Sequence, residues 1–145
     1  MKKRQQKQVV VVLGLVRGLD GRCLVTRRYQ PNLPSAHQKW QIPGGELEFG
    51  EEPRETLVRE ITEEVGLTAK IIDLLPYIGT SLWQNASVES HVILLCYLLE
   101  FTTGVVLLNK EASEFAWVYP DEMKEEDTLP HTMTFLTLAA KVANK

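Results

Sequence analysis

Residues 45–67 read GELEFGEEPRETLVREITEEVGL, and this stretch is the most informative part of the 145-residue chain. It predicts a helix that begins near Glu52, has Pro53 in its first turn and ends before Gly66. At about 100° per residue, the apolar residues of this helix share one face. We expect that face to point to a core through Leu57, Val58, Ile61 and Val65.

The helix is unusually acidic. Eight of the 19 acidic residues of the chain lie in residues 46–64. Glu60, Glu63 and Glu64 fall on an arc beside the apolar face, and Glu60 and Glu64 are one turn apart. Like charges at that spacing destabilise an isolated helix, but a divalent cation would turn their repulsion into attraction. Carboxylates and water are the ligands that Mg²⁺ and Mn²⁺ prefer.

Two features beside the acids favour a metal site over the alternative, an acidic face that only contacts water. Arg59 lies among the acids and can pair with one of them. Gly44 and Gly45 permit backbone geometry that other residues resist. A helix that needs only to be soluble requires neither feature.

The segment is similar to the Nudix box, the signature of the Nudix hydrolase family, written G-x5-E-x7-R-E-U-x-E-E-x-G-U with U apolar. Every defined position is filled, by Gly45, Glu51, Arg59, Glu60, Ile61, Glu63, Glu64, Gly66 and Leu67. The resemblance implies one Nudix domain over residues 1–145, with a mixed sheet between helices in an α/β/α sandwich. It also implies an enzyme that hydrolyses a nucleoside diphosphate linked to another group, X.

The resemblance assigns roles to these residues. Divalent ions, Mg²⁺ or Mn²⁺, would be bound by Gly44 through its carbonyl and by Glu60, Glu63 and Glu64. In some family members the equivalent of Glu60 also activates water. Arg59 and Glu51 would orient the box by pairing. The metal would neutralise the diphosphate and lower the pKa of an attacking water, and much of the catalysis would be electrostatic.

A further acid, distant in sequence, serves many family members as a metal ligand or base. Residues 110–117, KEASEFAW, resemble the corresponding segment, which makes Glu111 the first choice and Glu114 the alternative. A loop acid that only contacts water is the competing interpretation of Glu111.

An arginine pair follows the apolar run at residues 23–25. In the bacterial triphosphatase branch of the family, an arginine of such a pair contacts phosphate. Because adjacent residues of a strand face opposite ways, we expect one of Arg27 and Arg28 to point into the site and prefer Arg28.

Residues 40–51, WQIPGGELEFGE, resemble the MutT-like branch, which acts on small nucleoside triphosphates, including oxidised purine nucleotides. A nucleoside monophosphate and pyrophosphate would be the products. The alternatives for X are a nucleotide sugar, ADP-ribose or a dinucleoside polyphosphate. Loops at 30–39 and 81–88 are expected to frame a base, with Trp83 and His91 in contact with it. Core or dimer packing is the alternative for Trp83.

The rest of the chain predicts strands on both sides of the helix. The expected strands are 8–16, 22–29, 69–82, 89–101 and 115–119, with a short extended piece at 40–43. A helical turn is expected at 120–124 and a second helix at 130–143. This order indicates a mixed sheet with helices packed on its faces.

Composition excludes several classes of protein. With 44% hydrophobic residues and a net charge of −3, the chain is too apolar and too weakly charged to be disordered. It lacks the basic surplus of a protein that binds a nucleic-acid polymer. No apolar run reaches the ~18 residues that a membrane helix needs. Cys23 and Cys96 lie in apolar runs and are expected to be buried free thiols.

These observations predict a cytoplasmic enzyme whose partner is a small nucleotide. A homodimer through the apolar strand at 92–99 is an open alternative, since a core strand explains that run equally well. Two other classes compete with the enzyme: a module that binds a nucleotide without cleaving it, and an acidic helix that contacts a partner. Because the box has kept all its acids, the enzyme is favoured over both.

Overall fold

The computed structural model describes residues 3–143, so the ends of the predicted domain, 1–2 and 144–145, lie outside the described residues. The strands are β1 (Gln5–Arg17), β2 (Cys23–Arg28), β3 (Trp40–Gln41), β4 (Gly44–Glu46), β5 (Thr68–Leu74), β6 (Gly79–Gln84), β7 (Val88–Thr103) and β8 (Ala112–Val118). The helices are α1 (Pro53–Val65), α2 (Thr132–Ala140) and the short 3₁₀ turns η1 (Pro120–Glu122) and η2 (Glu125–Asp127).

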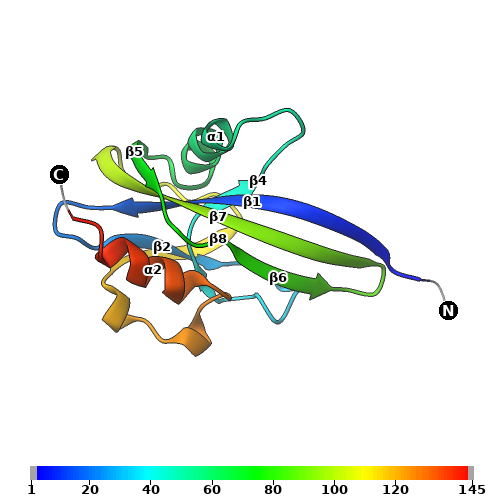
Figure 1. The fold of residues 1–145 in the computed structure, drawn as a ribbon. Coiled ribbons are helices and arrows are strands. Elements are labelled where there is room, and N and C mark those ends of the chain that lie inside the picture. The colour runs from blue at the N-terminus through cyan, green and yellow to red at the C-terminus, as the bar shows by residue number, and fades with distance from the viewer. Residues whose placement is uncertain (1–2, 144–145) are drawn as a thin grey trace.

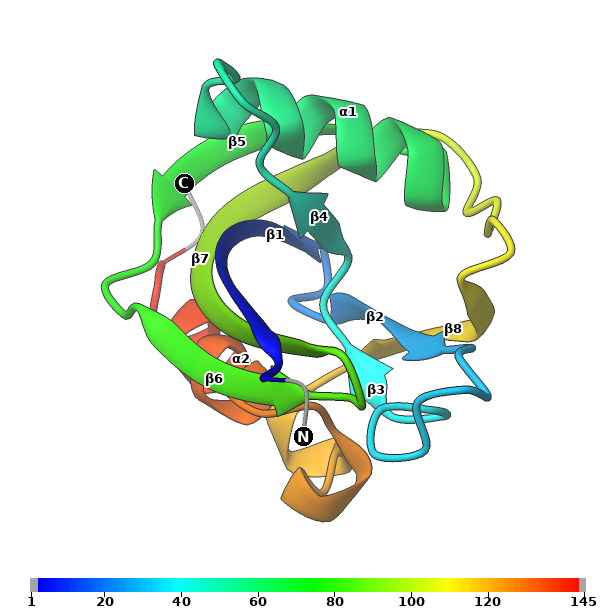
Figure 2. The ribbon, with the colours of Figure 1, turned by 90° about the vertical axis from the view of Figure 1, so that its right-hand side faces the viewer.

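The strands form one mixed sheet around β1 and β7, which run parallel and side by side along the whole length of β1. The main order is β3-β2-β1-β7-β5, with β4 on β1, β6 on β7 and β8 on β2. Helix α1 covers one face of this curved sheet and α2 covers the other (Figures 1 and 2). The predicted α/β/α sandwich with a mixed sheet is confirmed.

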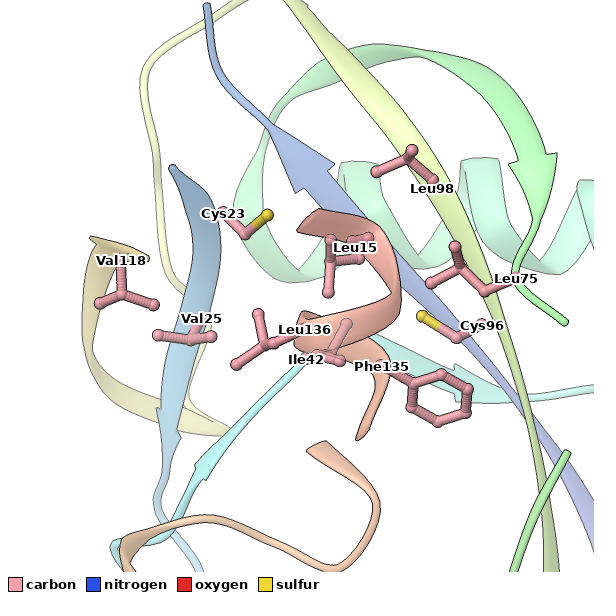
Figure 3. Packing of buried hydrophobic residues seen from close by; sticks show 11 residues of the cluster. Leu15, Cys23, Val25, Ile42, Leu75, Cys96, Leu98, Val118, Phe135 and Leu136 are labelled. Atoms are coloured by element: carbon pink, nitrogen blue, oxygen red, sulfur yellow. The ribbon is translucent and has the colours of Figure 1, made fainter. Parts of the chain in front are cut away.

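Alternation along β1 builds a core on each face, because successive side chains of a strand point to opposite sides. Val12 and Val16 of β1 pack with Leu57 and Ile61 of α1. On the other face, Leu15 belongs to a second cluster beneath α2 (Figure 3). That cluster also contains the two cysteines, Cys23 and Cys96, which are buried and free as expected.

Helix α1 is rotated about its axis relative to the apolar pattern, so that part of its acidic arc faces the protein. Leu57 and Val65 are buried, as expected, but Val58 is 59% exposed, so its assignment to the core is wrong. The buried arc instead includes Thr56 and Glu64, whose side chains face the protein. Val58 therefore contributes no contact to the core, and the carboxylate of Glu64 lies in the interior.

The predicted strand at 69–82 is two strands. β5 pairs with the second half of β7 and β6 with the first half, so both lie along the same neighbour. They are separated at residues 75–78, which contain Pro76. A proline has no N–H to donate to a sheet ladder, which explains the interruption. The helix expected at 130–143 is α2, which is shorter at both ends.

Candidate active site

Helix α1 is delimited at both ends by the residues that the sequence analysis singled out. Pro53 occupies the first turn, and Glu55 accepts a hydrogen bond from the backbone N–H of Glu52 at 3.1 Å. Gly66 adopts φ 69°, a left-handed conformation, and its N–H donates to the carbonyls of Ile61 and Thr62. These caps fix where the glutamates of the helix lie.

The two glycines before the helix permit an unusually close approach of β4 and α1. A Cβ on Gly45 would overlap the carboxyl group of Glu60. A Cβ on Gly44 would overlap backbone atoms of β1, namely the carbonyl oxygen of Val12 and Cα of Leu13. The N–H of Gly44 donates to Oε2 of Glu64 at 2.8 Å. Two carboxylates of the box are thus held against two glycines.

Arg59 lies at the centre of an ion-pair network within the box. Its Nε and Nη2 both donate to Glu51, each at 3.1 Å, and its Nη1 donates to Glu60 at 2.7 Å. Glu63 lies 3.6 Å from the same Nη1. Hydrogen bonds from Arg59, and then from Thr56, lower the pKa of Glu51 to about 2. The pairing role expected of Arg59 and Glu51 matches this geometry.

Glu64 is the buried acid of the site. Burial raises the pKa of Glu64 to about 8, and the nearby charges of Glu111 and Glu60 add to that effect. Burial also raises the pKa of Glu60, against the opposing hydrogen bond from Arg59. Crowded carboxylates that resist ionisation gain most from a nearby cation.

The donor chemistry fits a hard divalent ion, because the acids gathered here offer oxygen ligands that suit Mg²⁺ or Mn²⁺. Across residues 3–143, however, no group of three or more His, Cys, Asp or Glu side chains is already close enough to hold an ion. In the network described above, Glu60 and Glu63 both lie within ion-pair distance of the Arg59 guanidinium. An ion would have to compete with this arginine for both carboxylates.

The segment after β7 carries Glu111 to the same place. Its backbone follows the end of α1, where Leu107 and Asn109 donate N–H groups to the carbonyls of Val65 and Glu64. The Oδ1 of Asn109 accepts the N–H of Glu111 at 3.0 Å. The charge of Glu111 acts on the pKa of both Glu60 and Glu64.

The two arginines of β2 separate as adjacent strand residues should. Arg27 pairs with Glu114 of β8 at 2.6 Å, so the alternative acid is neutralised away from the box. Burial lowers the pKa of Arg28, and the nearby charges of Glu111 and Glu64 oppose that shift. The structure therefore brings together the preferred residue of each pair, Arg28 and Glu111.

The two residues expected at a base lie on opposite faces of the sheet. Leu82, not Trp83, is the neighbour of His91 across β6 and β7, so the side chains of Trp83 and His91 point opposite ways. Trp83 lines a hollow of about 430 Å³ with Ser35 and Pro130. His91 lines a groove of about 810 Å³, which shares Ser81 and Leu82 with that hollow.

Sequence reasoning missed His131 and Gln41. The ring of His131 lies between the hydroxyl of Tyr77 and the carbonyl of Thr80, with both nitrogens at 2.8 Å. Gln41 is buried and accepts a hydrogen bond from Arg28 at 3.1 Å. His131 joins α2 to residues more than 50 positions away and belongs to no motif. Gln41 lies in the segment 40–51, but nothing in that segment indicates a contact with Arg28.

The arrangement can be compared with known proteins. A family model described as NUDIX domain matches residues 7–136, which is most of the chain. The chain belongs to the Nudix family. It is a Nudix hydrolase, and enzymes of this family generally use divalent metal ions. Within residues 3–143, no helix of this Nudix chain is long and apolar enough to span a membrane.

Curated relatives of this Nudix chain include two diphosphatases. A putative 8-oxo-dGTP diphosphatase 2 of Mycobacterium tuberculosis is 28% identical over 94% of this chain and 91% of that protein. An 8-oxo-dGTP diphosphatase of Escherichia coli K12 is 30% identical over 68% of this chain and 70% of that protein.

Solved structures share the fold more widely. A MutT protein from Methanosarcina mazei has a TM-score of 0.70 at 25% identity, covering 96% of this chain and 94% of that one. A C. elegans Ap4A hydrolase has a TM-score of 0.65 at 18% identity, covering 90% and 93%. An ADP-ribose pyrophosphatase from Streptococcus suis has a TM-score of 0.66 at 16% identity, covering 92% and 90%. At such identities the last two show the fold alone.

Proposed function

We propose that this Nudix hydrolase uses Mg²⁺ or Mn²⁺ to cleave nucleoside triphosphates into a nucleoside monophosphate and pyrophosphate. The observation that carries the proposal is that Arg28 and Glu111 lie near enough to Glu64 of α1 for their charges to act on it, which supports a cation for phosphate beside carboxylates for metal. The diphosphatases named among its relatives support a triphosphate as the substrate.

Each residue of the site has a role in this proposal. The metal ligands are the carbonyl of Gly44 and the carboxylates of Glu60, Glu63, Glu64 and Glu111. When bound, the metal supplies electrostatic stabilisation of the phosphoryl group and acidifies a water. Arg59 and Glu51 hold the box in shape, and Arg28 contacts a phosphate. These roles agree with the pairing and burial described above.

One candidate site for the base is the hollow lined by Trp83, where the ring offers a stacking surface beside Ser35 and Pro130. Ser35 comes from the expected loop at 30–39, but Trp83 belongs to strand β6, so the loop expected at 81–88 is wrong for residues 81–84. His91 faces the other side of the sheet, the side of Val12 and α1, so the groove that it lines is the second candidate for the base. Oxidised and normal purines are both candidates.

We further infer that the partner is a small nucleotide in the cytoplasm. Residues 45–64 carry a net charge of −6, and the rest of the chain carries a net charge of +3. A slightly basic body around an acidic metal site suits an anionic substrate. A homodimer stays a prediction, which the mass of the protein in solution would test.

A substrate panel tests the proposal. Purified protein with Mg²⁺ is offered normal and oxidised nucleoside triphosphates, ADP-ribose, nucleotide sugars and dinucleoside polyphosphates, and the products are identified. We expect monophosphate and pyrophosphate from triphosphates. Strong turnover of ADP-ribose or sugar nucleotides with inert triphosphates would replace the proposed substrate. Tight nucleotide binding without metal-dependent turnover would instead show a binding module, and no divalent-ion binding would leave only an acidic partner-binding helix.

The variant Glu63→Gln tests the metal site. We expect kcat to fall by about 100-fold or more because a charged ligand is lost, while the fold stays intact since Glu63 is exposed. The matched control is Glu125→Gln, which makes the same change at an exposed glutamate of η2. A near-normal kcat for Glu63→Gln at saturating Mg²⁺ would show that the metal site is assigned wrongly.

A further inference from the structure

The arginines near the site differ in what holds them. Arg59 is surrounded by carboxylates, and Arg27 pairs with Glu114. Arg28 instead donates from Nε to the amide oxygen of Gln30 at 2.7 Å and from Nη1 to that of Gln41 at 3.1 Å. No carboxylate among residues 3–143 forms an ion pair with it.

The two amides come from different parts of the fold. Gln41 lies on β3, beside β2, and is 9% exposed, so its side chain has little freedom. Gln30 lies two residues beyond Arg28, at the start of the loop. Because an arginine carries only donors, both glutamines must present their oxygens to it. The guanidinium is thereby held on two of its nitrogens.

The backbone around Arg28 supports the same orientation. The pairing of β2 with β8 shifts register between Arg27 and Arg28, where Ser113 is the extra residue on β8, and Arg28 remains the last residue of β2. Its N–H donates to the carbonyl of Lys39, and the N–H of Tyr29 donates to the carbonyl of Glu111. The end of β2 is therefore tied both to the loop and to the segment that carries the further acid.

Neutral and charged partners have different consequences for an arginine that must bind an anion. A carboxylate would orient the guanidinium but also neutralise it, and it would compete with phosphate for the same donors. An amide oxygen orients it and leaves the full charge available. Nη2 of Arg28 makes no hydrogen bond within the described part of the chain, so this nitrogen of the guanidinium is available to an anion.

We propose that Gln41 and Gln30 are positioning residues, which aim Arg28 at a substrate phosphate while leaving its charge free. This inference rests on the phosphate contact of Arg28 in the proposed function, although it does not depend on which nucleotide is cleaved. It predicts that replacing either amide by a carboxylate of the same shape damages substrate binding.

The first experiment compares Gln41→Glu and Gln30→Glu with the control Gln5→Glu, which makes the same change at an exposed residue at the start of β1. For the best substrate of the panel, we expect KM to rise about tenfold or more in the first two variants, with kcat changed little. The control keeps its KM. An unchanged KM in both site variants would overturn the proposal.

The second experiment is a double-mutant cycle of Gln41→Met with Arg28→Met. Gln41→Met alone removes the acceptor without adding charge, and we expect KM to rise about 2- to 10-fold. In the Arg28→Met background we expect the same change to have no further effect, because Gln41 acts through Arg28. An equal effect in both backgrounds would show a merely structural role and refute the inference.

A binding measurement separates this inference from the substrate proposal. Inorganic triphosphate is titrated into each variant by calorimetry with Mg²⁺ present, and affinity should fall in Gln41→Glu and Gln30→Glu but not in Gln5→Glu. If the panel finds no substrate, the function fails but this comparison still tests the positioning role. Thermal unfolding of each variant checks the fold, and Gln30→Glu, at a half-buried loop residue, serves if the buried Gln41→Glu does not fold.

Discussion

At the scale of single residues, the box is shaped by how closely backbone and carboxylate approach. Gly45 leaves room for the carboxyl group of Glu60, and Gly44 both touches β1 and donates to Glu64. The two glycines look equivalent in the sequence, but different atoms lie against them. Their substitutions should therefore fail in different ways.

We expect Gly45→Ala to impair catalysis more than stability. The added Cβ meets the end of the Glu60 side chain, which can rotate away, so the metal ligand moves and kcat/KM falls about tenfold or more. In Gly44→Ala the Cβ meets backbone atoms of β1 that cannot move, so stability falls by about 2 kcal/mol or more. Urea unfolding and steady-state kinetics on both variants measure this contrast, and a stable, active Gly44→Ala would contradict it.

Glu64 makes stability depend on pH. Its pKa is about 8 in the folded protein against an ordinary 4.5, so the folded state binds more protons between those values. Stability without metal should therefore fall as pH rises from about 4.5 to about 8. Glu64→Gln should remove much of this slope, as an amide oxygen can still accept the Gly44 N–H. Denaturant unfolding in a chelator at pH 5 and pH 8 compares the two proteins, and equal slopes would refute the assignment.

At the scale of elements, α1 serves both the core and the site. One part of its buried arc, Leu57 and Ile61, packs on the sheet beside the close approach at Gly14. The adjoining part brings Glu64 inside. Helix rotation is thus a compromise between apolar burial and the placement of a carboxylate, and Val58 is exposed as a result.

This division of α1 predicts a contrast among its apolar residues. Leu57→Ala and Ile61→Ala should each cost about 2–5 kcal/mol of stability, because both side chains are buried. Val58→Ala should cost no more than about 0.5 kcal/mol, since that side chain is exposed. Chemical denaturation of the three variants measures the difference. A stability loss in Val58→Ala as large as that in Leu57→Ala would mean that Val58 is buried and that the helix has a different rotation.

At the scale of the whole molecule, the site joins segments that are far apart in sequence. The metal ligands we propose come from β4, α1 and the segment before β8, while Arg28 ends β2. Hydrogen bonds from residues 107 and 109 to the end of α1 hold two of these parts together. A bound cation would add a further link among all of them.

Divalent metal should therefore stabilise the fold. At a free Mg²⁺ concentration about 100 times Kd, binding to the folded state adds about 2.7 kcal/mol, and chelation removes it together with activity. Thermal unfolding with Mg²⁺ or with chelator measures the shift. Glu64→Gln should lose most of it, whereas Glu125→Gln should keep it. An unchanged melting temperature at Mg²⁺ concentrations that support turnover would contradict this coupling.

The sequence by itself determined the family, the ends of α1 and the mixed sheet. These depend on patterns along the chain: the spacing of the box, capping by Pro53 and Gly66, and the order of strands and helices. Only the tertiary structure decided that Val58 is exposed, that residues 69–82 form two strands and that Trp83 and His91 face apart. It also placed Gln41 against Arg28. Such features depend on which distant segments meet, and no local pattern of residues records that.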